Sequence, residues 1–254
     1  MKDKIKIDKT KPYTLLKGDA LELLPLFEPN TFDAVICDPP YASGSTTTKG
    51  RMMTTARKYT NAKVNNPLPN FAGDQQDQLS WTVWTIMWMN RVKEVLKDGG
   101  VFAFFIDWRQ LPAMSIAIQI AGLTWRGTVV WDKRNSRPQK GRFRQQTEYV
   151  MWGSKGKLDI KRNVPVLPGL YSYSNVQGAK RLHQTQKPLQ LMRDIVKFCE
   201  PNGLILDPFV GSGSTLHAAL LEGHNAVGIE KTESYYEIAK ERLENAAPTV
   251  GSST

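Results

Sequence analysis

The chain has 254 residues, of which 41% are hydrophobic and 23% are charged, as is ordinary for a globular protein. Its formal net charge of +10 indicates a polyanionic partner such as a nucleic acid. Two cysteines and three histidines exclude a disulfide framework and offer no metal-ligand spacing. No apolar run approaches the roughly 20 residues that span a bilayer, and the polar start is unlike a signal peptide. We therefore expect a cytoplasmic protein with no membrane partner.

Apolar runs of strand length alternate with segments of helical periodicity from residue 11 onward. We expect strands at 11–16, 33–37, 101–106, 128–131, 148–152, 203–206 and 226–229, and helices at 20–27, 79–96, 111–121, 189–198, 214–222 and 232–245. This alternation predicts a single α/β domain over residues 1–245, built around a mostly parallel sheet, with a disordered tail at 246–254. In such sheets, ligands bind beyond the carboxyl ends of the strands.

Two polar stretches, 42–78 and 153–180, show little periodicity and are expected to be loops. A structureless insertion as long as the first is usually a functional loop or a lid. Between them, Trp81, Trp84 and Trp88 recur at three- and four-residue steps. That spacing predicts a packing stripe on a helix rather than a base-stacking platform. The residues at 97–100, which end in two glycines, predict the end of this helix.

Positive charge is concentrated between residues 131 and 162, where ten lysines and arginines stand against three acids. The segment 140–146 mixes cations, an aromatic ring and amides. Such a mixture suits phosphates and base edges. A solvated basic face is the alternative interpretation.

Asp38-Pro39-Pro40-Tyr41 directly follows the strand expected at 33–37, where a buried strand meets a surface crevice. The prolines remove two backbone donors and leave free carbonyl acceptors beside a carboxylate and an aromatic ring. A carboxylate and a carbonyl can accept both hydrogens of an exocyclic amine while the ring stacks on its base. A strand end broken by prolines is the alternative.

A second motif, residues 207–215, follows the strand expected at 203–206 and opens a helix. Gly211 and Gly213 allow a tight turn and a close approach of the backbone to a ligand. Glu230 ends the next strand, where an acid accepts hydrogen bonds from ribose hydroxyls. The pattern is neither the dinucleotide fingerprint nor a P-loop. Asp207 would repel a pyrophosphate but hold a cationic amino group, and S-adenosylmethionine, a nucleoside that carries an amino acid, fits these charges.

Together, these motifs resemble a bacterial or phage amino-methyltransferase of DNA, of the class in which Asp-Pro-Pro-Tyr precedes the cofactor motif. The resemblance runs from about residue 13 to residue 243 and rests on residues 18–19, 38–41, 131–133 with Glu148, 183–189, 207–215 and 228–230. It implies a Rossmann-like class I methyltransferase fold, with a seven-stranded, mostly parallel sheet and one antiparallel strand. The third strand of the cofactor half is missing after Glu230. We therefore expect the strand at 11–16 to supply it, in a circularly permuted fold.

For catalysis, the resemblance implies that Asp38 and the carbonyl of Pro39 accept the hydrogens of the target amine, with Pro40 and Tyr41 completing the motif. This orients the nitrogen lone pair toward the methyl carbon and relieves positive charge as the bond forms. Tyr41 is expected to stack on a base flipped out of the duplex. Cys37 is expected to be packed, and the reaction needs no metal.

For the cofactor, the resemblance assigns Asp207 to the amino group, Glu230 to the ribose and Asp19 to the adenine ring amine. Asp19 also suits a helix N-cap before Ala20, and both interpretations stay open. The other residues expected to bind S-adenosylmethionine are Phe209, Gly211, Ser212 and Gly213 along the loop, and Thr185, Gln186 and Lys187 at the methionine carboxylate.

DNA contacts are expected from insertions at about 42–78 and 133–182. The residues expected to bind nucleic acid are Lys133, Arg134, Arg137, Lys140, Arg142 and Arg144. The implied partner is double-stranded DNA, with a cognate restriction endonuclease as a further candidate. The chain is expected to be a monomer or a homodimer.

The expected activity is site-specific methylation of adenine at N6, because the Asp-Pro-Pro-Tyr form leans toward adenine and Ser-Pro-Pro-Tyr would lean toward cytosine. Methylation of cytosine at N4 on the same scaffold is the main alternative. An RNA methyltransferase, a protein-amide methyltransferase (for which Asn would replace Asp38) and a catalytically inactive DNA-binding relative are further alternatives.

Overall fold

The computed structural model of the protein describes residues 3–8, 10–42, 76–176 and 186–246. Over this part of the chain the strands form one eight-stranded sheet in the order β1-β8-β7-β2-β3-β5-β4-β6. The strands are β1 (Tyr13–Lys17), β2 (Phe32–Cys37), β3 (Leu96–Ile106), β4 (Thr124–Asp132), β5 (Thr147–Ser154), β6 (Leu170–Ser172), β7 (Leu204–Asp207) and β8 (Asn225–Glu230). The helices are α1 (Ala20–Leu23), α4 (Gln78–Val95), α5 (Leu111–Ile120), α6 (Leu189–Val196), α7 (Ser214–Leu221) and α8 (Glu233–Ala246), with 3₁₀ turns at Leu24–Leu26 and Trp108–Gln110.

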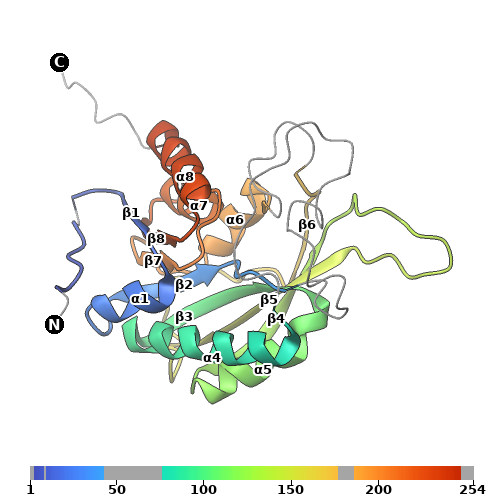
Figure 1. The fold of residues 1–254 in the computed structure, drawn as a ribbon, viewed down its shortest axis with the longest axis horizontal. Helices are drawn as coiled ribbons and strands as arrows, with labels where there is room; N and C mark the ends of the chain where they lie inside the picture. The colour runs from blue at the N-terminus through green and yellow to red at the C-terminus, as the bar shows by residue number, and fades with distance from the viewer. Residues whose placement is uncertain (1–2, 9, 43–75, 177–185, 247–254) are drawn as a thin grey trace.

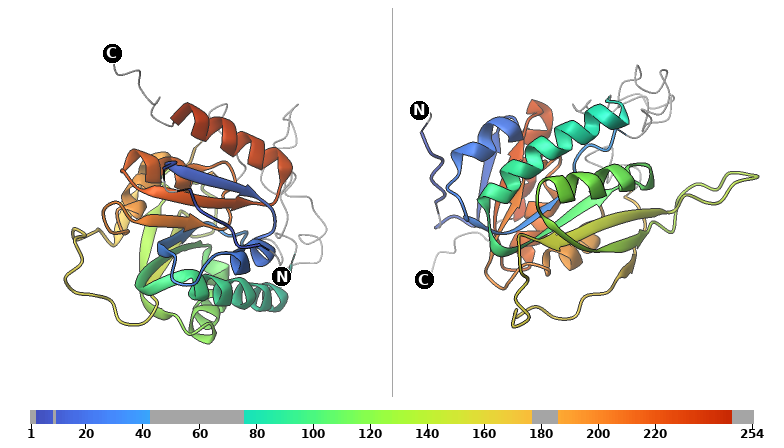
Figure 2. Two further views of the ribbon diagram at one scale, coloured as in Figure 1. Left: turned by 90° about the vertical axis from the view of Figure 1, so that its left-hand side faces the viewer. Right: turned by 90° about the horizontal axis from the view of Figure 1, so that it is seen from below.

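Helices cover both faces of the sheet (Figure 1). One face carries α4 and α5, and the opposite face carries α6, α7 and α8, as the two turned views also show (Figure 2). This three-layer arrangement confirms the predicted α/β fold. Within the described ranges, no helix is long and apolar enough to cross a membrane.

The directions of the strands agree with the prediction from the sequence, but the number of strands does not. β5 is antiparallel to both of its neighbours, and every other neighbouring pair is parallel. The expectation of seven strands was wrong, because β6 lies within 153–180, which was expected to be a loop. Its three residues pair with Val130–Asp132 of β4. A three-residue strand is too short to produce a periodic signal in the sequence.

The N-terminal strand completes the C-terminal half of the sheet, as predicted. β1 pairs in parallel with β8, in a register that runs from Tyr13 opposite Ala226 to Lys17 opposite Glu230. The half of the sheet that contains β7 and β8 is therefore assembled from both ends of the chain. The two halves meet where β2 pairs with β7.

The tryptophans of α4 form a packing stripe, as predicted. Trp81 and Trp88 have no exposed surface, and the Trp88 ring packs edge-on against Phe104 at 5.2 Å between ring centroids. Trp84 is half-buried and its ring lies 5.4 Å from that of Phe209. The helix thereby supports the loop that follows β7.

The end of α4 differs in detail from the prediction. The helix stops at Val95, as the glycines indicated, but residues 96–100 already belong to β3. The Gly99 amide donates to the Lys155 carbonyl at 2.8 Å, which ties this segment to the chain just beyond β5. Gly99 adopts φ +77°, a conformation that glycine takes without steric cost.

Candidate active site

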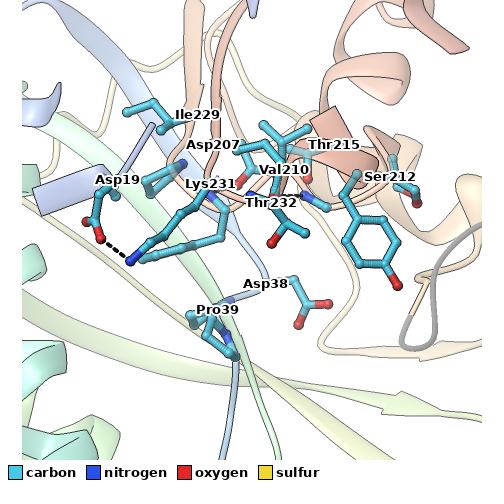
Figure 3. Close-up of a pocket in the computed structure, with 18 of the residues that line it drawn as sticks. Asp19, Asp38, Pro39, Asp207, Val210, Ser212, Thr215, Ile229, Lys231 and Thr232 are labelled. Atoms are coloured by element: carbon cyan, nitrogen blue, oxygen red, sulfur yellow. Dashed lines mark hydrogen bonds and ion pairs between the residues drawn. The ribbon is translucent and has the colours of Figure 1, made fainter. Parts of the chain in front are cut away.

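A cavity of about 370 Å³ opens at the carboxyl edge of the parallel strands. Asp19 follows β1, Asp38 follows β2 and Asp207 ends β7, and all three gather around this space (Figure 3). Twelve of the residues predicted to bind or react line it: Asp19, Asp38, Pro39, Pro40, Tyr41, Gln186, Lys187, Asp207, Phe209, Gly211, Ser212 and Glu230. Thr185 lies outside the described residues, and Gly213 is not part of the lining.

Asp38 is engaged at both carboxylate oxygens. Tyr41 donates its hydroxyl to Oδ1, and the Lys187 Nζ donates to Oδ2 at 2.6 Å. Burial raises the pKa of Asp38, and the Lys187 ammonium opposes this shift without cancelling it. The amine clamp predicted from the sequence is thus closed on the protein's own groups in this structure.

The backbone of the motif is held by two side chains from distant elements. Trp81 Nε1 donates to the Pro40 carbonyl at 2.7 Å, and Gln110 Nε2 donates to the Tyr41 carbonyl at 3.0 Å. None of the hydrogen bonds found among the described residues reaches the carbonyl of Pro39, which lines the cavity. The free acceptor is therefore the one predicted to receive an amine hydrogen. Nothing in the sequence indicated that Trp81 or Gln110 would donate to the backbone of this motif.

Tyr41 is largely buried, with 8% of its surface exposed. Burial, together with the nearby Asp38 carboxylate, raises the pKa of Tyr41 well above its ordinary value, so its hydroxyl stays protonated as a donor. The ring lines the cavity and has the Lys187 Nζ 5.1 Å from its centroid. Stacking on a base remains a prediction.

The cofactor loop is fixed by the acid at the end of β8. Glu230 Oε2 accepts from the Gly211 amide at 2.8 Å, and Oε1 accepts from the Thr232 amide at 2.7 Å. Gly211 and Gly213 have φ values of +54° and +83°. A Cβ at Gly213 would approach Ala239 of α8 to 3.3 Å. Gly213 therefore serves the packing of α7 on α8, which explains its absence from the cavity wall.

Asp207 is 1% exposed and its Oδ1 accepts from the Phe209 amide at 2.9 Å. Burial raises its pKa to about 7. No ion pair within the described part of the chain reaches this carboxylate. It is thus a buried acid that lacks a cation.

Asp19 is an N-cap, as the second interpretation of the sequence proposed. Its Oδ1 accepts from the Leu21 amide at 2.8 Å, and its Oδ2 pairs with Lys231 Nζ at 2.8 Å. It also lines the cavity, so a contact with an adenine ring stays a prediction. Lys231, which the sequence did not single out, lines the cavity beside it.

Lys187 differs from its expected role at a carboxylate of the cofactor. Its ammonium lies 2.6 Å from Asp38 and 3.3 Å from Glu148, and its side chain is 5% exposed. Burial lowers the pKa of Lys187, but the two carboxylates outweigh this effect and the net shift is upward. The ammonium is therefore committed to the catalytic carboxylate in this structure. Gln186 stands beside it on the cavity wall.

Lys133 also differs from its expected role as a DNA contact. Its Nζ donates to Glu148 Oε1 at 3.2 Å, and both side chains are only 16% exposed. Burial raises the pKa of Glu148, but Lys187 and Lys133 outweigh it and hold the pKa below its ordinary value. Lys133 thus belongs to the charge network of the cavity.

The other predicted nucleic-acid-binding residues lie on the loop that joins β4 to β5. Arg134, Arg137, Lys140, Arg142 and Arg144 are all exposed there. The loop projects well beyond the edge of the sheet (Figure 1). Arg144 braces its base by donating to the carbonyls of Ser136 and Arg134, each at 2.7 Å.

The basic segment is divided by the fold. The cations at 155, 157, 161 and 162 follow β5, which runs against the other strands, and so they lie at the opposite edge of the sheet. There Arg162 pairs with Glu200, just ahead of β7. The cations of this one basic segment therefore lie at two opposite edges of the sheet.

Cys37 is packed in the core, as predicted. Cys37 is fully buried, and burial raises the pKa of its thiol well above the ordinary value, which makes it a poor nucleophile. Among the residues that the structure describes, no group of three His, Cys, Asp or Glu side chains is placed to hold a metal.

This sheet order and cavity are those of a class I methyltransferase. The crystal structure of the M1.HpyAVI–SAM complex matches with a TM-score of 0.65 at 24% identity, covering 91% of this chain and 98% of that one. The structure of the cytosine-N4-specific PvuII DNA methyltransferase matches with a TM-score of 0.66 at 20% identity, covering 92% and 93%. These likenesses confirm the predicted fold.

The chain belongs to the family of N6/N4 DNA methylases, whose family model matches residues 32–241. Among curated proteins, it is 29% identical over 230 residues to the putative methylase YubD of Escherichia coli (strain K12). That alignment covers 90% of this chain and 88% of YubD. The predicted class of enzyme, a DNA methyltransferase that uses S-adenosylmethionine, is confirmed at the level of the family.

Proposed function

We propose that the chain transfers a methyl group from S-adenosylmethionine to N6 of an adenine flipped out of double-stranded DNA, at a short recognition sequence. The observation that carries this proposal is that Asp38 and the Pro39 carbonyl share one cavity with Asp207, Gly211 and Glu230. One space thus offers acceptors for an amine together with groups for a nucleoside that carries an amino acid.

The state of Asp207 supports the cofactor assignment. Its carboxylate is buried without a cation among the described residues, and its pKa is raised to about 7 by burial. Such a group is stabilised by a ligand that brings a positive charge, and the amino group of S-adenosylmethionine is one. The Gly211 loop, fixed by Glu230, lines the same cavity.

Bound S-adenosylmethionine supplies an electrophilic methyl group on its sulfonium. Asp38 and the Pro39 carbonyl accept the two hydrogens of the target amine, which turns the nitrogen lone pair toward that methyl group. As the N–C bond forms and the C–S bond of the sulfonium breaks, the nitrogen gains positive charge, which the Asp38 carboxylate stabilises. S-adenosylhomocysteine is the leaving group, and the methylated amine then loses one proton to solvent. Tyr41 offers its ring to the face of the base.

A base that is stacked in a duplex cannot reach Asp38 inside the cavity. The base must therefore be flipped out, which costs roughly a few kcal/mol. We propose that the cations of the β4–β5 loop, within the insertion at 133–182, help to hold the duplex against this edge. The insertion at 42–78 is the second proposed contact, although residues 43–75 lie outside the described part of the chain. Partnership with a restriction endonuclease and the oligomeric state remain predictions.

Methylation of cytosine at N4 is the second candidate. The same two acceptors suit the exocyclic amine of cytosine, and the PvuII enzyme of similar fold is named as cytosine-N4-specific. Aspartate rather than serine at position 38 favours adenine, by the resemblance described above.

Expression in a host that lacks DNA methylation, followed by single-molecule sequencing of its chromosome, tests the proposal. We expect N6-methyladenine at one short motif and none with the Asp38→Ala variant. Modified cytosine at N4 instead would overturn the choice of base. Unmodified DNA, despite a folded protein that binds S-adenosylmethionine, would overturn the proposed function as a whole.

A further inference from the structure

Behind the catalytic carboxylate lies a buried group of four charges. Asp38 and Glu148 are the anions, and Lys187 and Lys133 are the cations. Glu148 stands on β5 opposite Trp131 of β4 and holds Lys133 through Oε1 at 3.2 Å. Its Oε2 lies 3.3 Å from the Lys187 Nζ, yet among the described residues this oxygen is buried and has no hydrogen-bond partner.

This arrangement conflicts with a productive base complex. The target amine needs an Asp38 oxygen, and in this structure Tyr41 donates to Oδ1 and Lys187 donates to Oδ2, so the entering amine competes with both donors. The ammonium that leaves Asp38 is enclosed by protein, since its side chain is 5% exposed. A buried cation that loses its partner without gaining another is strongly unfavourable. Another acceptor must therefore stand close by.

The following inference rests on the proposed function. We propose that Glu148 is a positioning residue. When the amine of the target base binds Asp38, the Lys187 ammonium moves from Asp38 to Glu148. Oε2 of Glu148, which already lies 3.3 Å from the Lys187 Nζ, is the acceptor that the ammonium approaches more closely. The rings of Tyr41, Phe105 and Trp131 surround the Lys187 Nζ at 5.1, 5.3 and 6.0 Å and stabilise the cation along this short path.

The exchange affects the chemical step more than cofactor binding. The two anions and two cations balance before and after it, because the entering amine is neutral. Once Lys187 has moved, Asp38 no longer shares its negative charge with an ammonium. The Asp38 carboxylate then stabilises more strongly the positive charge that develops on the amine nitrogen.

Single-turnover methyl transfer tests this role, with labelled S-adenosylmethionine and chromosomal DNA from a methylation-free host. For Glu148→Gln we expect a rate roughly 10- to 100-fold lower at saturating DNA and cofactor, as follows from losing one partner of a buried ion pair. Affinity for S-adenosylmethionine, measured by calorimetry, should change by less than about threefold. Glu148→Asp, which keeps the charge, should recover much of the rate.

Glu222→Gln is the matched control, since Glu222 is also 16% exposed and pairs with two cations, Arg193 and Lys197, away from the cavity. Both Gln variants lose ion pairs at a carboxylate of equal exposure, so both should lower the melting temperature. Only Glu148→Gln should slow methyl transfer. Equal slowing by the two variants would mean that a general loss of stability explains the effect and would overturn the proposal.

The double variant gives the sharpest result. If Glu148 acts through Lys187, then Glu148→Gln combined with Lys187→Met should be no slower than Lys187→Met alone. Additive losses would overturn the proposal, and so would a loss of S-adenosylmethionine affinity in Glu148→Gln that equals its loss of rate. A wild-type protein that binds S-adenosylmethionine but methylates no DNA would overturn the proposed function and this inference with it.

Discussion

At the scale of single residues, the amine clamp depends on side chains that never touch the amine. Trp81 and Gln110 donate to the carbonyls of Pro40 and Tyr41, so among the described residues the Pro39 carbonyl is the acceptor of the motif that remains. Trp81 lies on α4 and Gln110 lies ahead of α5, so one helical layer sets the shape of the motif. These two hydrogen bonds fix the backbone of residues 38–41 before a base arrives.

Trp81→Phe tests this support. The substitution keeps most of the buried ring but leaves the Pro40 carbonyl without its donor, which should lower the free energy of unfolding by about 1–3 kcal/mol. Methyl transfer should slow because the Pro39 carbonyl is no longer held in place. Urea unfolding and single-turnover rates measure both effects.

Trp88→Phe is the matched control for that experiment. Trp88 is equally buried on the same helix, but among the described residues its Nε1 has no hydrogen-bond partner. The Trp88→Phe variant should therefore lose only packing contacts. If Trp88→Phe slowed methyl transfer as much as Trp81→Phe, the hydrogen bond to Pro40 would have no special role.

Asp207 should make cofactor affinity depend on pH. Its pKa is raised to about 7 in the free protein, chiefly by burial. Below that pH the carboxyl is protonated and must lose its proton before it pairs with an amino group. Affinity for S-adenosylmethionine should thus rise as pH increases toward about 7, by up to about tenfold per pH unit.

Calorimetric titrations from mildly acidic to mildly alkaline pH, on wild type and Asp207→Asn, measure this dependence. The variant should bind S-adenosylmethionine more weakly, with little change in affinity over the acidic half of the range. An unchanged pH dependence in Asp207→Asn would show that another group is responsible.

At the scale of elements, the β4–β5 loop and the segment after β5 carry similar charge to opposite edges of the sheet. Only the loop leaves the edge at which the cavity opens. The loop should therefore contact DNA, whereas the cations after β5 should not. Arg144 is a poor choice for testing this, since it also braces the loop.

A variant with Arg137, Lys140 and Arg142 all replaced by Gln should bind duplex DNA more weakly. The slope of log affinity against log salt concentration should flatten by up to about 2.7, or roughly 0.9 for each phosphate that is no longer neutralised. Lys157→Gln with Lys161→Gln, at the opposite edge, is the control and should leave the slope unchanged. Fluorescence anisotropy at several salt concentrations gives both slopes. Equal flattening of the slope by the two variants would show that the net charge of the protein, and not the position of the loop, determines DNA binding.

At the scale of the whole molecule, Asp33 joins the two halves of the sheet. It lies on β2, and its Oδ2 accepts from the Leu204 amide of β7 at 2.9 Å. Its Oδ1 accepts from Lys97 Nζ of β3 at 2.6 Å. The backbone register between β2 and β7 covers only two residue pairs, so this carboxylate extends the junction.

Asp33→Ala should lower the free energy of unfolding by about 2–3 kcal/mol, because it removes a charged acceptor and strands the Leu204 amide. Asp159→Ala, which removes an exposed carboxylate bonded to the Lys161 amide, should change it by less than about 0.5 kcal/mol. Urea denaturation compares the two. A similar small loss in both would mean that β-pairing alone joins the halves.

Much of the site could be predicted from the chain because its motifs are local. A turn such as 38–41 or 207–215 has its chemistry in consecutive residues, and parallel strands bring their carboxyl ends to one edge. The placement of β1 beside β8 also followed from the order of the motifs. The sequence by itself thus determined the fold class, the family and the two halves of the cavity.

Only the tertiary structure decided how the charges are paired. Lys187 and Asp38 are 149 residues apart, and Lys133 pairs with Glu148 in the interior although Arg134 beside it is exposed. The reversal of β5 places four of the ten cations of the basic segment at the opposite edge of the sheet. Each of these depends on which elements come into contact in three dimensions, and electrostatic pairing between distant residues leaves no periodicity or local motif in a single sequence.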